Sequence, residues 1–170
     1  MALPAFGPYT RLGLAAALIT LVLDQASKLW LLFVFELPEK GQVHLLPFLD
    51  FVMVWNTGIS YGLFPQEGTV GQWILFAIKV AAVILLLGWL YRAGTRLTGL
   101  GLGLIVGGAL GNAVDRLAYG AVADFVLFYL HTGSFRFNWY VFNLADVAIV
   151  AGVAAVLYDS LIKGDAVKAP

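Results

Sequence analysis

The sequence contains no cysteine, and only 12% of its 170 residues are charged. Without thiols the chain can form no disulfide, no thiol nucleophile and no cysteine-ligated zinc site. A soluble domain typically has about a quarter of its residues charged, so half that fraction indicates a membrane protein. The formal net charge is zero, which argues against a nucleic-acid partner held through its backbone phosphates.

Apolar residues dominate instead, at 61% of the chain and a mean hydropathy of +0.90. A transmembrane helix needs roughly 20 consecutive apolar residues, and four segments are long enough. We therefore expect a membrane all-α fold with four transmembrane helices, built as one domain over residues 1–170. The expected spans are 12–35, 70–91, 97–114 and 139–162, and the outer loops between them are 36–69 and 115–138.

The distribution of basic residues predicts the orientation of the chain in the membrane. Four spans place both termini on one side, and five lysines and arginines fall there against three on the other. These are Arg11, Arg92, Arg96, Lys163 and Lys168, against Lys40, Arg116 and Arg136. Because basic residues concentrate on the cytoplasmic side, we expect a multi-pass membrane protein with cytoplasmic termini and with the outer loops on the opposite face.

The outer loops carry short patterns typical of strands. Residues 49–55 and 121–126 are rich in β-branched and aromatic residues, and the turn-forming residues 56–58 follow the first of them. We expect a small sheet at the outer membrane surface, with a short helical loop over residues 58–64. Trp139 and Tyr140 fit an interfacial aromatic belt at the start of the fourth span.

Glycine is concentrated in the third span. Gly103, Gly107 and Gly111 are spaced four apart, a pattern of small residues that allows helices to approach closely in lipid. Packing is the first role expected for these glycines, although Gly108 and Gly111 also leave room beside the polar residues that follow them.

The polar residues at the ends of the apolar segments are the candidate site. Asp24, Asp124 and Asp146 are expected in or against the bilayer, where ionisable groups are costly and point to function. Two carboxylates held close together share a proton, so that one can activate water while the other protonates a leaving group. The alternative is that each aspartate satisfies a local polar partner, as Asp24 and Lys28 can do at positions i and i+4 of a helix. Composition alone leaves both readings open.

Four sequence blocks carry a resemblance to a known family. They are DQASK (24–28), NTGISY (56–61), GGALGNAVDR (107–116) with VADF (122–125), and FNLAD (142–146). In their order and spacing the chain resembles the lipoprotein signal peptidases, or signal peptidase II, the bacterial membrane aspartic proteases. Ser60 and Tyr61 depart from the family's usual Ala-Phe, which bears on loop packing and not on the chemistry.

The resemblance implies a catalytic pair, Asp124 and Asp146, that cleaves diacylglyceryl-modified prolipoproteins just before the lipidated cysteine. It implies no metal or other cofactor and a location among the lipids of the bacterial inner membrane. We expect a monomer, because every catalytic group comes from one chain. Residues lining or supporting the site would be Asn56, Gly108, Asn112, Arg116, Asn143, Asp24, Lys28 and Asp115. Among them Asp115 is expected to be a helix-end partner of Arg116, and Asp24 and Lys28 to be supporting residues.

Other readings remain at this stage. A small proton-coupled carrier would use Asp24, Lys79, Asp124 and Asp146 as relay groups across the bilayer. A Ser60–Lys79 nucleophile pair is a weaker alternative, because the lysine lies several turns along its helix. His44 and His131 have no second ligand at metal spacing, so we expect both to be surface residues.

Overall fold

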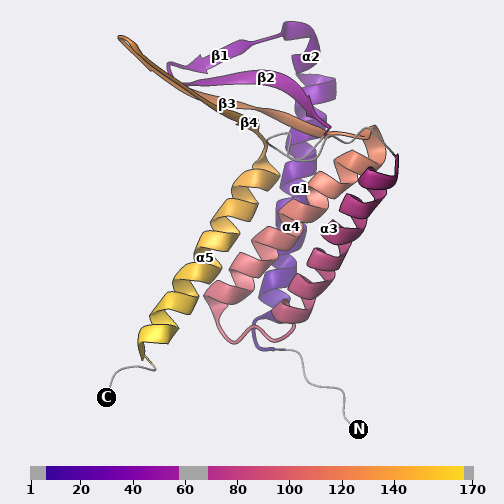
Figure 1. Ribbon diagram of the computed structural model, residues 1–170, viewed down its shortest axis with the longest axis vertical. Helices are drawn as coiled ribbons and strands as arrows, with labels where there is room; N and C mark the ends of the chain where they lie inside the picture. The colour runs from indigo at the N-terminus through magenta and orange to yellow at the C-terminus, as the bar shows by residue number, and fades with distance from the viewer. Residues whose placement is uncertain (1–6, 58–68, 167–170) are drawn as a thin grey trace.

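The computed structural model describes residues 7–57 and 69–166, whose helices and strands form two separate layers. A helical bundle forms one layer and a small antiparallel sheet lies across one end of it (Figure 1). The helices are α1 (Thr10–Leu29), continued by the π-helical turn η1 (Trp30–Val34), α2 (Leu37–Lys40), α3 (Thr69–Leu90), α4 (Arg96–Tyr119) and α5 (Leu144–Ala166). The strands are β1 (Val43–Leu46), β2 (Leu49–Asn56), β3 (Val122–Thr132) and β4 (Phe135–Phe142).

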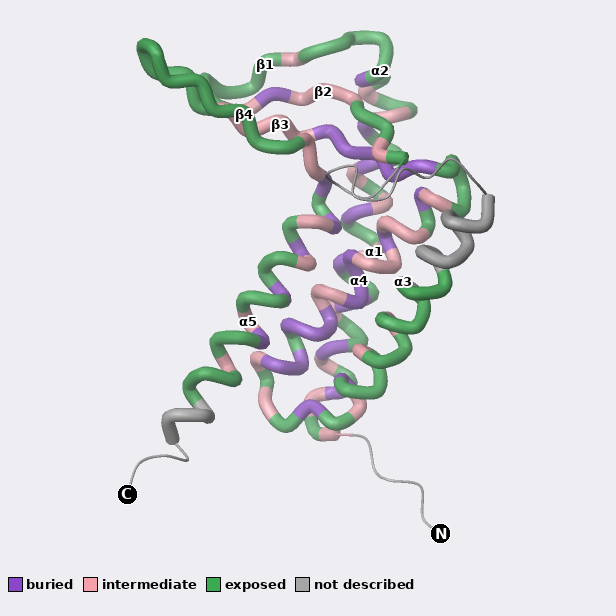
Figure 2. Tube along the Cα trace, viewed as in Figure 1, coloured by how far each residue is buried: buried purple, intermediate pink, exposed green. Residues whose placement is uncertain are grey.

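Helix α4 is the centre of the bundle and packs against α1, α3 and α5. Figure 2 shows buried residues along much of its length, while the outer faces of α1, α3 and α5 are largely exposed. The glycines of α4 make this contact possible. A Cβ atom on Gly107 would lie 2.5 Å from the carbonyl oxygen of Ala17 in α1, and one on Gly108 would lie 2.5 Å from that of Ala145 in α5. The expected close helix approach is thus confirmed.

Three helices in the described residues are long and apolar enough to cross a membrane. They are Thr10–Val34, Arg96–Tyr119 and Leu144–Ile162. Helix α3 occupies the expected second span, and its apolar part among the described residues is Val80–Leu90. The prediction of spanning helices is therefore confirmed for three segments, and a fourth crossing stays a prediction.

The sheet has the strand order β1-β2-β3-β4, with every neighbouring pair antiparallel. Both strands predicted from the sequence are present, although β3 runs on to Thr132. At the bundle end of the sheet Asn56 pairs with Val122 and Val54 with Asp124. This register brings the end of β2 and the start of β3 together above the helices.

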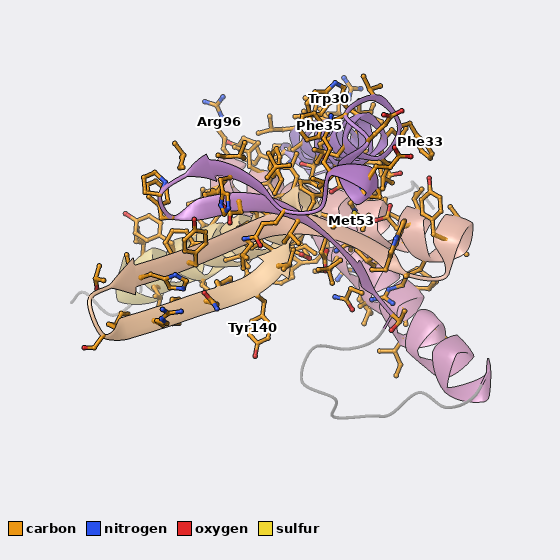
Figure 3. All side chains as sticks on the ribbon, turned by 90° about the horizontal axis from the view of Figure 1, so that it is seen from above. Trp30, Phe33, Phe35, Met53, Arg96 and Tyr140 are labelled. Carbon is orange, nitrogen blue, oxygen red and sulfur yellow. The ribbon has the colours of Figure 1, made fainter. Side chains whose placement is uncertain are left out.

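Aromatic residues join the end of α1 to the sheet. Trp30 and Phe35 stack with ring centroids 5.2 Å apart, and Phe35 contacts Phe51 of β2 edge-on. Figure 3 shows Trp30, Phe33 and Phe35 together at this end of the helix. Leu31, Leu37 and Phe125 form a small buried core beneath. The sheet is therefore fixed to the bundle by packing as well as by its connections.

Two boundaries predicted from the sequence are wrong. Residues 135–142, part of the expected loop and fourth span, form strand β4, and α5 begins at Leu144. Aromatic residues in 135–142 are apolar enough for a span, but they pair with β3, for example Phe137 with Leu130. The helix predicted as the third span, α4, also continues beyond residue 114. It ends at Tyr119, because Gly120 has a φ of 73°. The predicted helical loop over 58–64 lies outside the described residues.

Candidate active site

The two predicted catalytic aspartates come from different elements that start near the same end of the bundle. Asp124 is the third residue of β3 and is buried, whereas Asp146 lies in the first turn of α5 and is half-buried. Strand β4 returns the chain from the tip of β3 so that Phe142 pairs with Val126. The hairpin therefore carries the start of α5 back to Asp124.

Asn143 connects the two aspartates directly. Its side-chain nitrogen donates to Asp124 Oδ1 at 2.6 Å, and its backbone N–H donates to Asp146 Oδ2 at 3.2 Å. Its side-chain oxygen accepts the backbone N–H of Asp146 at 3.0 Å. Asn143 is fully buried, so these hydrogen bonds form away from bulk water, where satisfied polar groups hold a defined geometry.

Asp124 has the environment of a carboxyl group that keeps its proton. Burial raises its pKa to about 6, with a further increase from the nearby charge of Asp146. Hydrogen bonds from Asn56 and Asn143 and the charge of Lys28 act in the opposite direction. The amide of Asn56, at the end of β2, donates to Asp124 Oδ2 at 3.1 Å. Asp124 is therefore poised to titrate near neutral pH, which suits general acid–base chemistry.

Asn112 of α4 reaches the other carboxylate. Its side-chain nitrogen donates to Asp146 Oδ1 at 3.0 Å, and its oxygen accepts from Asn143 and from Lys28. Asn112 and Asn143 thus orient the pair of aspartates from two elements. The sequence predicted both residues at the site, and the structure brings them together there.

Lys28 and Asp24 form the predicted i, i+4 ion pair on α1, with Lys28 Nζ 2.8 Å from Asp24 Oδ2. The same nitrogen lies 2.8 Å from Oδ2 of Asp115 on α4. All three side chains are at most 2% exposed. Asp115 was expected to be a partner of Arg116, but its close ionic partner here is Lys28. The sequence could not show this pairing because the two residues are far apart in the chain.

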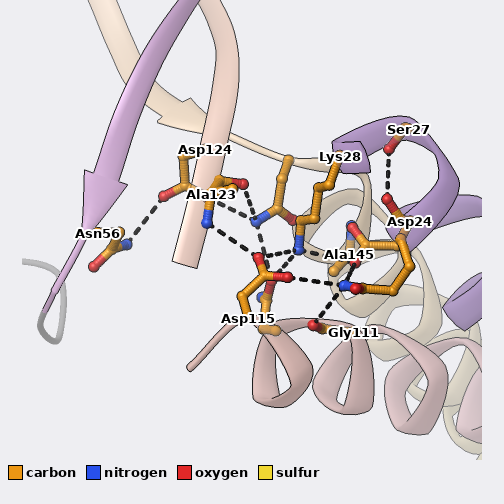
Figure 4. A network of polar contacts seen from close by, with 12 residues as sticks. Asp24, Ser27, Lys28, Asn56, Gly111, Asp115, Ala123, Asp124 and Ala145 are labelled. Atoms are coloured by element: carbon orange, nitrogen blue, oxygen red, sulfur yellow. Dashed lines mark hydrogen bonds and ion pairs between the residues drawn. The ribbon is translucent and has the colours of Figure 1, made fainter. Parts of the chain in front are cut away.

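Gln25 is a residue that sequence reasoning missed. Its side-chain nitrogen donates to Asp115 at 2.8 Å and to the carbonyl oxygen of Gly111 at 3.0 Å (Figure 4). It lies in the DQASK block beside Asp24, so the block itself was the available signal. Gln25 joins α1 to α4 next to the ionic cluster.

Arg116 and Gly108 complete the predicted set. Arg116 is half-buried in the last turn of α4. Its charge interacts electrostatically with three carboxylates, most strongly with Asp124 and then with Asp115 and Asp146. The space beside Gly108 is occupied by the backbone of Ala145 and the side chain of Ile149. Gly108 thus allows α5 to approach, and we assign it to packing.

No group of three or more histidine, aspartate or glutamate side chains in the described ranges is arranged to hold a metal ion. The Ser60–Lys79 pair falls outside what the structure describes, since it covers neither Ser60 nor the side chain of Lys79. His44 is exposed, as predicted, but it contacts a buried aspartate, Asp50, at 3.0 Å.

The fold is shared with solved structures of bacterial membrane enzymes. One solved by the in meso method at 2.3 Å matches with a TM-score of 0.73 and 23% identity, over 92% of this chain and 91% of that one. A second, at 1.9 Å, gives a TM-score of 0.70 at 23% identity, over 88% of this chain and 92% of that one. At this identity the likeness concerns the fold alone.

Sequence comparison decides the family. The family model described as signal peptidase (SPase) II matches residues 16–162. The chain belongs to the signal peptidase II family. It is similar to the lipoprotein signal peptidases of Nitrobacter hamburgensis and Rhodopseudomonas palustris, each 59% identical over 94% of this chain and 98% of the relative. The lipoprotein signal peptidase of Methylorubrum extorquens is 61% identical over 89% of this chain and 86% of its own.

Membership in the signal peptidase II family makes the chain an aspartic-type peptidase, a hydrolase. The resemblance drawn from the four sequence blocks is thereby confirmed. The apolar spanning helices agree with an integral membrane enzyme.

Proposed function

We propose that this chain cleaves the signal peptide from diacylglyceryl-modified prolipoproteins just before the lipidated cysteine, with Asp124 and Asp146 as its catalytic pair. Its relatives at 59–61% identity are lipoprotein signal peptidases. The observation that carries the assignment of residues is the bridge through Asn143, which hydrogen-bonds to both carboxylates. One buried residue thus holds both carboxylates, and the pKa of Asp124 is raised by burial and by the charge of Asp146, the latter as in a coupled pair.

The chemistry follows from the different surroundings of the two aspartates. Asp146, in the first turn of α5, acts as the general base and takes a proton from a water molecule as the water oxygen attacks the scissile carbonyl carbon. Asp124, protonated because it is buried, gives its proton to the leaving amide nitrogen as the C–N bond breaks. One carboxyl has gained a proton and the other has lost one, so a proton transfer between them restores the pair.

The polar groups around the pair divide into two roles in this proposal. Asn112 and Asn143 orient the carboxylates, since their side chains bond to the pair and to each other. Arg116, half-buried with its charge acting on Asp124, is placed to bind a substrate carbonyl, because a guanidinium presents several donors in a fixed plane. Asn56 supports Asp124 from the sheet.

We place the sheet at the outer surface of the membrane and the termini in the cytoplasm. The β3–β4 hairpin has one apolar face, on which Leu130 pairs with Phe137, and one polar face, on which His131 pairs with Arg136. An exposed apolar face beside membrane-spanning helices favours contact with the lipid interface. Helix α1 begins and α5 ends at the bundle end opposite the sheet (Figure 1), which agrees with termini on the other side.

The grouping of charges favours a peptidase over a carrier. The buried cluster of Asp24, Lys28 and Asp115 hydrogen-bonds to Ala123 and Ala145, which precede Asp124 and Asp146 in the chain. A proton-coupled carrier needs ionisable groups arranged along a path across the bilayer. A cluster beside one surface suits a substrate that is cleaved there, and all its groups come from one chain, which suits a monomer.

Cleavage of a purified diacylglyceryl-modified prolipoprotein tests this proposal. We expect cleavage of the lipidated form and not of its unlipidated counterpart. Asp124→Asn and Asp146→Asn should each lower kcat by about 10²–10⁴-fold, the usual worth of a general acid or base. The matched control is Asp159→Asn, which neutralises a carboxylate hydrogen-bonded to Thr95 and Thr98 away from the pair. Wild-type rates in either dyad variant would refute the catalytic assignment.

A further inference from the structure

The residue that precedes each catalytic aspartate has its backbone N–H held by a buried carboxylate. Ala145 donates to Asp24 Oδ1 at 2.9 Å, and Ala123 donates to Asp115 Oδ2 at 3.0 Å. Ala145 comes just before Asp146 and Ala123 just before Asp124. Helices α1 and α4 thus each hold the backbone that carries one member of the pair (Figure 4).

A single lysine lies between these two carboxylates. Lys28 Nζ is 2.8 Å from Asp24 Oδ2 and 2.8 Å from Asp115 Oδ2, and it donates to Asn112 Oδ1 at 3.1 Å. An ammonium has three donors, so these contacts use all of them. The third also leads to the catalytic pair, because Asn112 donates to Asp146 at 3.0 Å.

We propose that Lys28 is a positioning residue that sets the separation of Asp124 and Asp146 by holding Asp24 and Asp115 against the strand and helix that carry them. The inference rests on the proposed catalytic pair and explains how the separation of its two aspartates is set. Strand β3 and helix α5 reach the site from different parts of the fold. The contacts of Lys28 with Asp24 and Asp115 connect both elements to one residue.

The contacts of Lys28 argue for a supporting role and against direct chemistry. Its side chain is buried, and its three donors are occupied by Asp24, Asp115 and Asn112. A buried carboxylate without a counter-charge takes up a proton. Replacing Lys28 by an uncharged residue would leave Asp24 and Asp115 buried without the ammonium that bridges them, so their side chains would move and their other hydrogen bonds would change. Both alanine N–H groups depend on those carboxylates, so the strand and the helix would shift independently.

The test is Lys28→Met in the full-length membrane enzyme, which gives an unbranched side chain one atom shorter and removes every donor. Misplacement of reacting groups by about 1 Å can cost 10²-fold in rate, so we expect kcat to fall about 10²-fold while KM stays within about threefold. The upper pH limit of cleavage should also move to higher pH, because the charge of Lys28 lowers the pKa of Asp124. The pH shift follows from the charge of Lys28 alone, whereas a residue that only stabilises the fold would leave the kcat of the folded enzyme unchanged.

Asp159→Asn is the matched control, because it neutralises a carboxylate that joins α5 to the start of α4 without touching the site. It should lower the melting temperature and leave kcat and the pH profile unchanged. Folded Lys28→Met with the wild-type kcat would overturn the proposal.

If Lys28→Met does not fold, Asp24→Asn and Asp115→Asn provide the test, since asparagine keeps one oxygen to accept the alanine N–H. Each should lower kcat by about tenfold, with KM little changed, because each loosens only one of the two elements. Wild-type kcat in both would overturn the positioning role. If Asp124→Asn and Asp146→Asn also stay active, the proposed catalytic pair itself has failed, and the two failures are thereby told apart.

Discussion

Asn143 and Asp146 cap each other at the start of α5. The backbone N–H of Asp146 donates to the side-chain oxygen of Asn143 at 3.0 Å, and the backbone N–H of Asn143 donates to the carboxylate of Asp146 at 3.2 Å. This reciprocal arrangement is a capping box, which satisfies two of the free N–H groups at a helix start. The same asparagine donates to Asp124, so starting the helix and aligning the two aspartates depend on one side chain.

Removing the Asn143 side chain should therefore affect both stability and activity. In Asn143→Ala we expect the free energy of unfolding to fall by about 1 kcal/mol, the usual worth of an N-cap. The rate of cleavage should fall at least tenfold, since Asp124 and Asp146 lose their common partner. Thermal unfolding in detergent and cleavage of the lipidated substrate measure the two effects.

Thr95→Ala is the control for this prediction. Thr95 is the N-cap of α4, where its hydroxyl accepts the backbone N–H of Thr98 at 3.1 Å. Its loss should cost a similar amount of stability and leave the cleavage rate of the folded enzyme unchanged. An equal loss of activity in both variants would show that Asn143 acts on the fold alone.

The raised pKa of Asp124 predicts how cleavage depends on pH. The carboxyl must be protonated to act as the general acid, and burial places its pKa at about 6. Activity should therefore decline as the pH rises through that value. The profile of kcat/KM measures this, since it reports ionisations of the free enzyme.

Asn56→Ala tests the origin of that pH limit. The amide of Asn56 donates to Asp124 and lowers its pKa. Without it the pKa of Asp124 should rise further, and the decline in kcat/KM should move to higher pH. A decline that stays in place, or moves to lower pH, would contradict the assignment of this ionisation to Asp124.

The close packing of Gly107 in α4 predicts that its replacement by alanine and that of Gly88 in α3 have opposite effects on stability. A Cβ on Gly107 would meet the backbone oxygen of Ala17 at 2.5 Å and the Cβ of Thr20 at 2.7 Å. Gly107→Ala should then force α1 and α4 apart and lower stability by about 1–3 kcal/mol. Gly88→Ala in α3 meets nothing within 4 Å and should raise stability by up to about 1 kcal/mol, because alanine is the better helix former. The melting temperatures of the two purified variants test this difference. Equal values would contradict the close approach of α1 and α4 at Gly107.

The sequence was most informative where the deciding contacts are local. The Asp24–Lys28 pair follows from their spacing on one helix, and the strands that carry Asn56 and Asp124 follow from their β-branched and aromatic residues. The resemblance then supplied the pairing of Asp124 with Asp146.

Features that depend on distant contacts could not be predicted. The ion pair between Lys28 and Asp115 joins two helices, and no local pattern indicates it. Strand β4 was read as the start of a span because apolar aromatic residues suit lipid and a sheet equally, and only pairing with β3 decides between them. The carboxylate of Asp50 was overlooked for the same reason, since its partners lie on β3 and around β1.

Asp50 gives a last prediction, on the stability of the sheet. Its carboxylate is fully buried and accepts hydrogen bonds from Gln42, His44 and Tyr129. Burial alone would raise its pKa, but these hydrogen bonds and the charge of His44 bring the pKa below its ordinary value of 3.8. The ionised group therefore contributes stability that is present above about pH 4 and is lost as the pH falls through the lowered pKa.

Asp50→Asn should consequently destabilise the protein by about 1–3 kcal/mol at neutral pH, the cost of disturbing a buried, hydrogen-bonded charge. The difference from wild type should shrink as the pH is lowered, because wild-type Asp50 then becomes neutral as well. Melting temperatures of both proteins between about pH 3 and 7 measure this, with Glu39→Gln as the control, since Glu39 is an exposed carboxylate of the neighbouring α2. A constant difference across this range would mean that Asp50 stabilises the sheet through shape and not through its charge.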